Sequence, residues 1–135
     1  MAKPRRSPCP IAFSLDLFGD RWTLLILRDM VFGYKHHYRE FLQGGEGIST
    51  NILADRLDRL VEGGLVQKAE DPDDRKQFRY TLTEKGLDLI PLLLEMIAWG
   101  GRHDPATGAP EEYVERIRTD REAVIEEIRD RHRPG

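Results

Sequence analysis

The chain has 135 residues, 33% of them are charged, and its net charge is only -3. This composition gives no sign of a nucleic-acid-binding protein, although basic side chains can still gather on one face. This length fits one domain with an accessory helix. No apolar run reaches the roughly 18 residues of a membrane span, the N-terminus lacks the apolar region of a signal peptide, and a single cysteine excludes an intramolecular disulfide. We therefore expect a cytoplasmic protein with no membrane segment.

Residues 1–8 are basic and interrupted by proline, which predicts a mobile arm. Two interpretations stay open: a solvated tail, or an arm that lies along DNA phosphates or in a minor groove. The basic side chains for such a contact are Lys3, Arg5 and Arg6.

Two helices are predicted next. Pro10 suits the first turn of a helix, which places Cys9 at or near its cap. Apolar side chains on one face of this helix are Ile11, Leu15 and Phe18. Gly19-Asp20 ends this helix and caps a second one, which apolar residues surround almost completely. The second helix should therefore be the most buried element of the domain.

A helix-turn-helix is predicted from a short helix over 39–43, a glycine-rich turn at 44–47 and a longer helix from Ile48. Ser49 or Thr50 can cap the longer helix. Its apolar residues recur at the three- and four-residue steps of one buried stripe, namely Leu53, Leu57, Leu60 and Val61.

A β-hairpin is predicted after this helix. Gly63-Gly64 ends the helix, and residues 65–69 and 77–82 are typical of two strands joined by a turn at 71–74. A helix followed by a hairpin with a charged tip is the arrangement of a winged helix, so we predict a mainly α fold with a small β-hairpin wing. In that fold the helix enters the DNA major groove and the hairpin contacts backbone or minor groove.

The predicted DNA contacts lie at the start of the longer helix and in the wing. The side chains of Ser49, Thr50 and Asn51 suit phosphates or base edges. Arg56, farther along the exposed face, can reach guanine or phosphate. The basic wing residues are Arg75, Lys76 and Arg79. The alternatives are an ordinary capped amphipathic helix and a wing tip whose charges pair with its own aspartates.

Neither a metal site nor a catalytic site is predicted. His36 and His37 are adjacent, so their side chains point in different directions, and no cysteine lies near to complete a metal site. We expect a surface or backbone-phosphate contact for these two histidines instead. The sequence has no phosphate-binding glycine loop, no Gly-x-Ser-x-Gly turn and no acid–histidine–nucleophile set with an evident scaffold. We expect no enzyme and no cofactor.

The C-terminal third predicts a dimer. Residues 83–99 are apolar on nearly all sides, and Pro91 within them predicts a bend. Residues 100–110 predict a linker, and 111–133 a last helix whose apolar stripe packs either on its own domain or on a second subunit. The linker and the narrow stripe favour the second subunit. The predicted interface comprises Ile11, Leu15, Leu93, Ile97, Val114, Ile117, Val124 and Ile128. The predicted parts are thus an arm (1–8), a DNA-binding domain (9–99), a linker (100–110) and a dimerisation helix (111–135).

From Cys9 to about Trp99 the chain resembles the HxlR-type winged helix-turn-helix regulators of bacteria and archaea. The resemblance rests on the order and spacing of several motifs: Cys9-Pro10, Gly19-Asp20-Arg21-Trp22, Tyr38-Arg39-Glu40-Phe41-Leu42, Gly47-Ile48-Ser49, Leu53-Ala54-Asp55-Arg56-Leu57, Gly64-Leu65-Val66 and Tyr80-Thr81-Leu82-Thr83-Glu84-Lys85-Gly86. The wing departs from that family, whose tips are usually proline-rich. Asp73 and Arg75 are instead similar to wings of the MarR family, where arginine enters the minor groove and aspartate holds it.

The resemblance implies a dimeric transcriptional regulator, often a repressor, with its first and last helices in the interface. Some members sense electrophiles or oxidants through the N-terminal cysteine, and others have no known effector. Cys9 faces the positive end of a helix dipole, which stabilises a thiolate, so it is either such a sensor or a small structural residue.

We predict a homodimer that binds a pseudo-palindromic site on double-stranded DNA and controls transcription there. The alternative is a winged-helix module that binds only protein. A small-molecule pocket among the late helices would add to the first interpretation rather than replace it.

Overall fold

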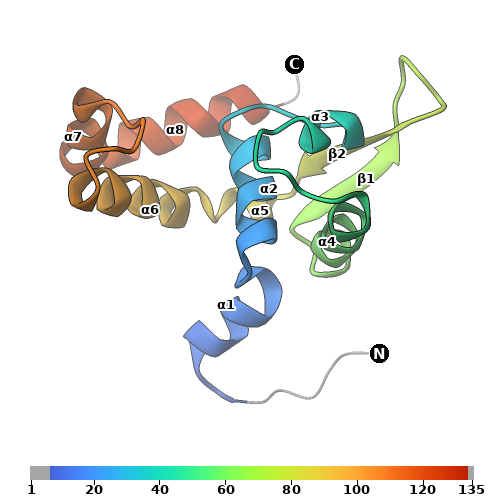
Figure 1. The fold of residues 1–135 in the computed structure, drawn as a ribbon, viewed down its shortest axis with the longest axis horizontal. Helices are drawn as coiled ribbons and strands as arrows, with labels where there is room; N and C mark the ends of the chain where they lie inside the picture. The colour runs from blue at the N-terminus through green and yellow to red at the C-terminus, as the bar shows by residue number, and fades with distance from the viewer. Residues whose placement is uncertain (1–6, 134–135) are drawn as a thin grey trace. The chain divides into compact units, whose positions relative to one another are not determined.

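The computed structural model describes residues 7–133, which form two compact units divided between Thr83 and Glu84. The first unit contains helices α1–α4 and the hairpin β1–β2, and the second contains helices α5–α8 (Figure 1). Most of the arm predicted over residues 1–8 lies outside the described residues. None of the described helices is long and apolar enough to cross a membrane.

The first unit is a winged helix-turn-helix. Its elements are α1 (Pro10–Phe18), α2 (Arg21–Val31), α3 (Tyr38–Leu42), α4 (Thr50–Glu62), β1 (Val66–Glu70) and β2 (Phe78–Leu82). The strands pair antiparallel, from Val66 opposite Leu82 to Glu70 opposite Phe78. Because α3, the glycine turn, α4 and the hairpin follow one another as expected, the predicted fold class is confirmed.

The core of this unit lies between α2 and α4, which pack against each other. As predicted, α2 is its most buried element. The fully or nearly fully buried side chains of the two helices are Ile26, Leu27, Met30, Val31, Leu53, Leu57 and Leu60. Phe41 of α3 and Tyr80 of β2 meet edge to face with ring centroids 6.4 Å apart, so one aromatic pair joins the helix-turn-helix to the wing.

Helix α1 leaves its apolar face open. None of its residues is buried. Ile11 is 70% exposed, Leu15 58% and Phe13 46%. Three large apolar side chains within five positions of one helix form an unusual concentration of exposed apolar surface.

The second unit corrects three predicted boundaries. Its helices are α5 (Glu84–Leu87), α6 (Ile90–His103), α7 (Glu111–Thr119) and α8 (Arg121–His132). Pro91 does not bend a continuous helix but lies in the first turn of α6, where its missing N–H is not needed. α6 runs on through Gly100 and Gly101, so the connection to α7 is 104–110. The predicted last helix is interrupted at Asp120 (φ -142°, ψ 45°), a residue type that favours helix caps over helix interiors.

Helices α6, α7 and α8 pack on one another, and this packing corrects the predicted dimer interface. Leu93, Ile117, Val124 and Ile128 are all at most 5% exposed in a single chain. The apolar stripe of 111–133 thus packs on its own chain, the alternative that the sequence also allowed. The interruption at Asp120 divides this stripe between two short helices, α7 and α8, and both pack on α6. Ile97 and Val114 are half-buried.

Candidate nucleic-acid interface

The start of α4 presents polar side chains to solvent. The Ser49 hydroxyl caps the helix, accepting from the Ile52 N–H at 3.2 Å, so Ser49 is the cap and Thr50 the first helical residue. Ser49, Thr50 and Asn51 are all exposed. The Ser49 hydroxyl accepts in the cap and keeps its own hydrogen for donation. The Tyr38 hydroxyl donates to the Thr50 carbonyl at 3.0 Å, which ties α3 to this end of α4.

The sequence placed Arg56 on the exposed face of α4, and the structure shows that this prediction is wrong. Its Nε donates to Oδ2 of Asp20 at 2.9 Å, it also pairs with Asp55, and its side chain is only 20% exposed. The hydrogen bond with Asp20 raises the pKa of Arg56 against the effect of burial. Arg56 therefore links α4 to the start of α2, and we no longer count it among the DNA contacts. Arg59, which is 61% exposed, pairs with Asp55 one turn earlier.

Asp20 is the residue on which this link depends. It caps α2 by accepting from the N–H groups of Trp22 and Thr23 at 3.1 and 3.2 Å. It also accepts from the hydroxyl of Thr23, which is 1% exposed. Partial burial opposes ionisation, but bonds from Thr23 and Arg56 outweigh it and lower the pKa of Asp20. One carboxylate thus holds two helices, through a contact between residues 36 apart that sequence patterns did not indicate.

A second ion-pair cluster fixes the turn before α4. Glu46 accepts from Arg21 at 3.2 Å and from Arg28 at 2.8 Å, both on α2. Gly45 and Gly47 flank it with φ values of 87° and 77°, a backbone conformation that side chains disfavour. The glycine turn was predictable from composition, whereas its attachment to α2 was not.

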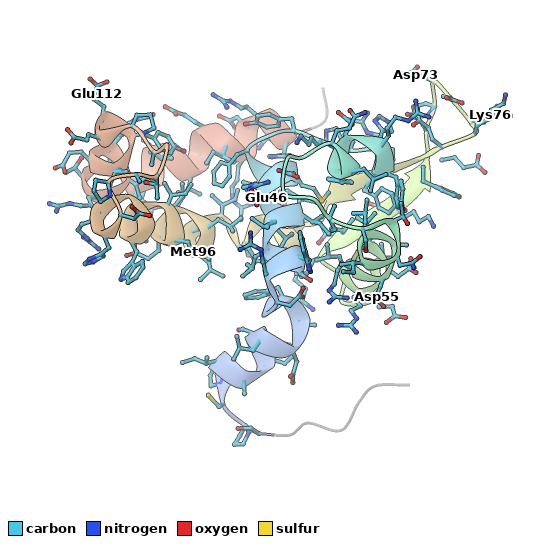
Figure 2. All side chains as sticks on the ribbon, in the orientation of Figure 1. Glu46, Asp55, Asp73, Lys76, Met96 and Glu112 are labelled. Atoms are coloured by element: carbon cyan, nitrogen blue, oxygen red, sulfur yellow. The ribbon has the colours of Figure 1, made fainter. Side chains whose placement is uncertain are left out.

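The wing carries exposed basic side chains beyond a structured base. Figure 2 shows Asp73 and Lys76 at the far end of the hairpin loop. The aspartates bind the backbone of the loop: Asp71 accepts from the N–H of Asp73 at 2.8 Å, and Asp74 from that of Lys76 at 3.0 Å. Within residues 7–133, no ion pair joins a carboxylate to Arg75, Lys76 or Arg79.

The structure therefore favours a basic wing tip over one whose charges pair with each other. Arg75 and Lys76 are exposed, and Arg79 in β2 is half-exposed. Among residues 7–133, Asp73 and Arg75 do not form the aspartate–arginine ion pair that the resemblance to MarR wings implies. On the hairpin itself, the Lys68 ammonium lies 4.2 Å from the centroid of the Phe78 ring.

The two adjacent histidines lie between the helix-turn-helix and the wing. The Tyr80 N–H donates to the His36 carbonyl at 2.8 Å, and Nδ1 of His36 lies 3.0 Å from the Tyr80 carbonyl oxygen. His37 bonds to Glu40 and Asp71. The surface or phosphate contact that we expected for these residues is therefore replaced by internal hydrogen bonds. No cluster of three metal-binding side chains occurs among the described residues.

Cys9 is exposed and sits at the N-cap of α1, where the sequence placed it. Its carbonyl accepts from the Phe13 N–H at 3.1 Å, and its N–H donates to the Ser7 hydroxyl at 3.1 Å. The thiol makes no capping hydrogen bond. Its accessibility fits a reactive role, which stays a prediction.

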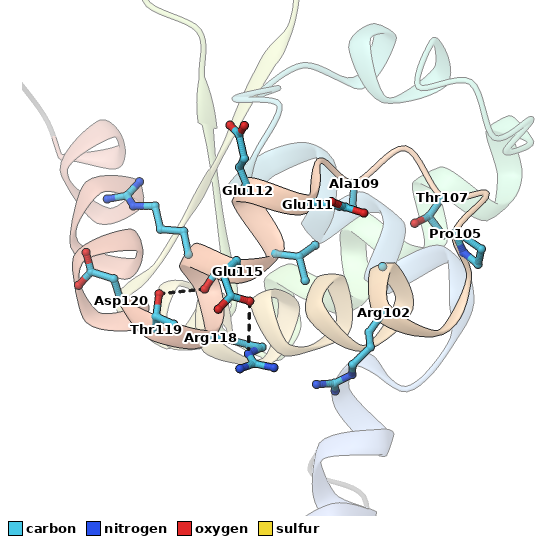
Figure 3. Close-up of a pocket in the computed structure, with 13 residues that line it drawn as sticks. Arg102, Pro105, Thr107, Ala109, Glu111, Glu112, Glu115, Arg118, Thr119 and Asp120 are labelled. Atoms are coloured by element: carbon cyan, nitrogen blue, oxygen red, sulfur yellow. Dashed lines mark hydrogen bonds and ion pairs between the residues drawn. The ribbon is translucent and has the colours of Figure 1, made fainter.

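A hollow of about 950 Å³ lies in the second unit between the end of α6, the connection 104–110 and α7 (Figure 3). On the α7 side, the Thr119 hydroxyl donates to the Glu115 carbonyl, and Glu115 pairs with Arg118 at 3.7 Å. The hollow is open to solvent, and seven of the thirteen residues that line it are charged. A small-molecule effector site here stays a prediction.

A capped, exposed helix after a glycine turn, followed by a basic wing, defines the class of DNA-binding helix-turn-helix regulators. The profile of the family described as HxlR-like helix-turn-helix matches residues 17–107. The chain belongs to this family of transcriptional regulators, whose role is not enzymatic.

Relatives and solved structures agree with this assignment. An HTH-type transcriptional regulator of Mycobacterium bovis is 37% identical over 72% of this chain and 60% of its own length, so the chain spans less than two thirds of that relative. The regulator YybR of Bacillus subtilis is 31% identical over 72% of this chain and 77% of its own.

Among solved structures, the transcription factor candidate PA1607 superposes with a TM-score of 0.68 at 36% identity, covering 76% of this chain and 72% of its own. The redox regulator HypR in its oxidized form gives 0.62 at 30% identity, covering 71% and 98%. The reduced form of the regulator YodB from B. subtilis gives 0.58 at 31% identity, covering 75% and 100%.

Proposed function

We propose that the protein is a cytoplasmic repressor that binds a pseudo-palindromic DNA site as a homodimer and occupies a promoter. The observation that carries this proposal is the pairing of two features in one unit. The start of α4 exposes Ser49, Thr50 and Asn51, and the hairpin that follows α4 presents Arg75 and Lys76 to solvent. Asparagine can bond adenine in the major groove, and guanidinium groups suit a narrow minor groove of negative potential.

A gel shift on DNA from upstream of the protein's own gene tests this proposal. Repeating it across salt concentrations should give specific binding with a steep salt dependence, because each neutralised phosphate releases counterions. Weak and equal binding to all DNA fragments would favour the other class, a winged-helix module that binds only protein.

Exposed apolar side chains support dimerisation. In the first unit these are Ile11, Phe13 and Leu15 of α1, and in the second Leu92, Met96 and Trp99 of α6. The spacing of the α6 residues, four then three, places them on one helical face. These six residues now carry the dimer proposal, because Leu93, Ile117, Val124 and Ile128 are buried within the chain.

Ile11→Asp is expected to turn the dimer into a monomer. Burying an isoleucine is worth about 1.5–3 kcal/mol, and a two-fold interface contains the change twice, so the dissociation constant should rise by about 100-fold or more. Sedimentation velocity at micromolar concentration measures this. Phe78→Asp is the matched control, since Phe78 is 47% exposed but lies on the wing. A wild-type protein that is already monomeric, or an Ile11→Asp protein that stays dimeric, would contradict the proposal. Truncation after Gly108 is no substitute, because it removes the buried Ile117, Val124 and Ile128.

We further propose that Cys9 responds to oxidants or electrophiles. The thiol is exposed and lies two residues before Ile11, so modification there would disturb the α1 surface. HypR is described as a redox regulator, and YodB has been solved in diamide-treated and quinone-bound forms.

Diamide treatment is therefore expected to change operator affinity in the wild type and leave a Cys9→Ser variant unchanged. As the only cysteine, Cys9 can form a disulfide only with another chain, which a non-reducing gel detects. Mass spectrometry verifies that the thiol has been modified. If the modified protein binds its operator with unchanged affinity, Cys9 has a structural role and is not a sensor.

A further inference from the structure

His37 is placed between two carboxylates from different parts of the first unit. It is the N-cap of α3, and its Nδ1 lies 2.9 Å from Oε1 of Glu40 in the same helix. Its Nε2 lies 2.5 Å from Oδ2 of Asp71, which is 34 residues away at the end of β1. Asp71 is only 4% exposed, although it stands at the base of the wing loop.

Two ionised carboxylates around one imidazole ring favour a charged histidine. An ionised carboxylate offers only acceptors, so both ring nitrogens must donate for both contacts to form, and only the imidazolium has two N–H groups. Burial opposes the charge on His37, but the bonds to Glu40 and Asp71 outweigh it and raise its pKa above 6.5. The pKa of Asp71 is lowered by the Asp73 N–H and by His37. Burial opposes ionisation of Glu40, but bonds from the N–H of His36 and from His37 lower its pKa.

Both carboxylates also organise the backbone around them. Glu40 accepts from the N–H groups of His36 and His37 at 3.2 and 3.1 Å, which fixes the start of α3. Asp71 closes the base of the wing loop, because it accepts from Asp73 while its own N–H donates to the Gln77 carbonyl at 3.1 Å. The imidazolium therefore joins the start of the helix-turn-helix to the base of the loop that carries Arg75 and Lys76.

We propose that His37 is a positioning residue that, as an imidazolium, fixes the wing loop against the helix-turn-helix for DNA binding and holds it less firmly on losing its proton. This inference rests on the proposed function, in which the wing contacts DNA. A neutral ring can donate to only one carboxylate and turns a lone pair toward the other. Other ionisable groups nearby do not replace the contact: His36 faces the Tyr80 carbonyl, and Asp74 accepts from the backbone of Lys76.

The sign of the pH dependence follows from the direction of each shift. Because folding raises the pKa of His37, the stability that this residue contributes to the first unit is fully present below about pH 6.5. It is lost as the pH rises through the higher pKa of the folded protein. Because the pKa values of Glu40 and Asp71 are lowered, their contribution is lost only in acid, as pH falls through those values. Operator affinity should therefore fall on the alkaline side of neutrality.

The test compares the affinity of four full-length proteins for one upstream duplex at about pH 6 and about pH 8.5, at constant ionic strength. Wild type should weaken by about three- to tenfold over this interval, the fold-change that corresponds to losing one net hydrogen bond. His37→Arg stays charged and can donate to both carboxylates, so its affinity should be nearly constant. His37→Gln should be weak at both pH values, and His36→Gln should keep the wild-type slope. Equal slopes for wild type and His37→Arg would overturn the proposal.

A second measurement needs no DNA. NMR titration of the histidine rings in the free protein, with His37 assigned from the His37→Gln spectrum, should give a midpoint above 6.5 for His37, and the Asp73 backbone resonances should follow it. A His37 midpoint at or below 6.5 would overturn the ionic contact itself. If His37 titrates as expected but none of the four proteins binds DNA, the proposed function and the coupling to DNA are both overturned. The ionic contact of His37 would still be supported.

Discussion

Asp20→Ala is expected to lower the free energy of unfolding of the first unit by about 2–3 kcal/mol. The change removes the cap of α2, worth about 0.5–2 kcal/mol, and leaves the hydroxyl of the buried Thr23 without its acceptor, at a cost of about 1–3 kcal/mol. It also removes the hydrogen bond from Arg56 to Asp20 that links α4 to α2. Urea unfolding measures the loss. In a Trp99→Phe background the fluorescence comes from Trp22, so the signal reports the first unit alone.

Two further variants separate the causes. Asp20→Asn keeps an acceptor for the cap but no charge for Arg56, so it should lose roughly half as much as Asp20→Ala. Asp16→Ala is the matched control, because Asp16 is an exposed aspartate of α1. If Asp20→Ala were no less stable than Asp16→Ala, the carboxylate would not hold the two helices together.

Arg75→Ala and Asn51→Ala are expected to weaken DNA binding in different ways. Arg75 lies in the wing, so its loss should lower affinity for many sequences alike and reduce the slope of log affinity against log salt by about one. Asn51 lies at the start of α4, so its loss should relax preference at one base pair, worth roughly 1–3 kcal/mol. Lys76→Ala should behave like Arg75→Ala.

Selection of preferred sites from a random pool, with affinities at several salt concentrations, distinguishes these effects. Arg118→Ala removes an exposed arginine of α7 and controls for the change in net charge. Unchanged affinity and unchanged preference in both Arg75→Ala and Asn51→Ala would remove these residues from the interface.

Local patterns were sufficient to predict the winged helix-turn-helix. The Ser49 cap, the apolar stripe of α4 and the turn between two short strands each depend on residues close in sequence, and all three are present. Boundaries failed where a residue type has two uses. Pro91 either bends a helix or begins one, and only the preceding turn at Asp88 and Leu89 decides between them.

Long-range polar contacts were beyond the sequence. Arg56 and His37 each have plausible surface roles, and nothing near them in the chain indicates that Asp20 or Asp71 lies within hydrogen-bond distance. The same holds for the stripe of Ile117, Val124 and Ile128, whose spacing predicts a buried face but not which surface covers it. Partner choice for a charged or apolar side chain is a property of the folded chain.

Hydroxyl-radical footprinting of the protein on its own upstream DNA tests the central claim most directly. A dimer with two recognition helices should protect two half-sites about one helical turn, roughly 10 bp, apart on one face of the duplex. Minor-groove protection flanking each half-site should weaken in Arg75→Ala while the central pattern remains. A single unpaired footprint would contradict the dimeric mode of binding, and uniform cleavage under conditions where the protein is folded would contradict sequence-specific DNA binding itself.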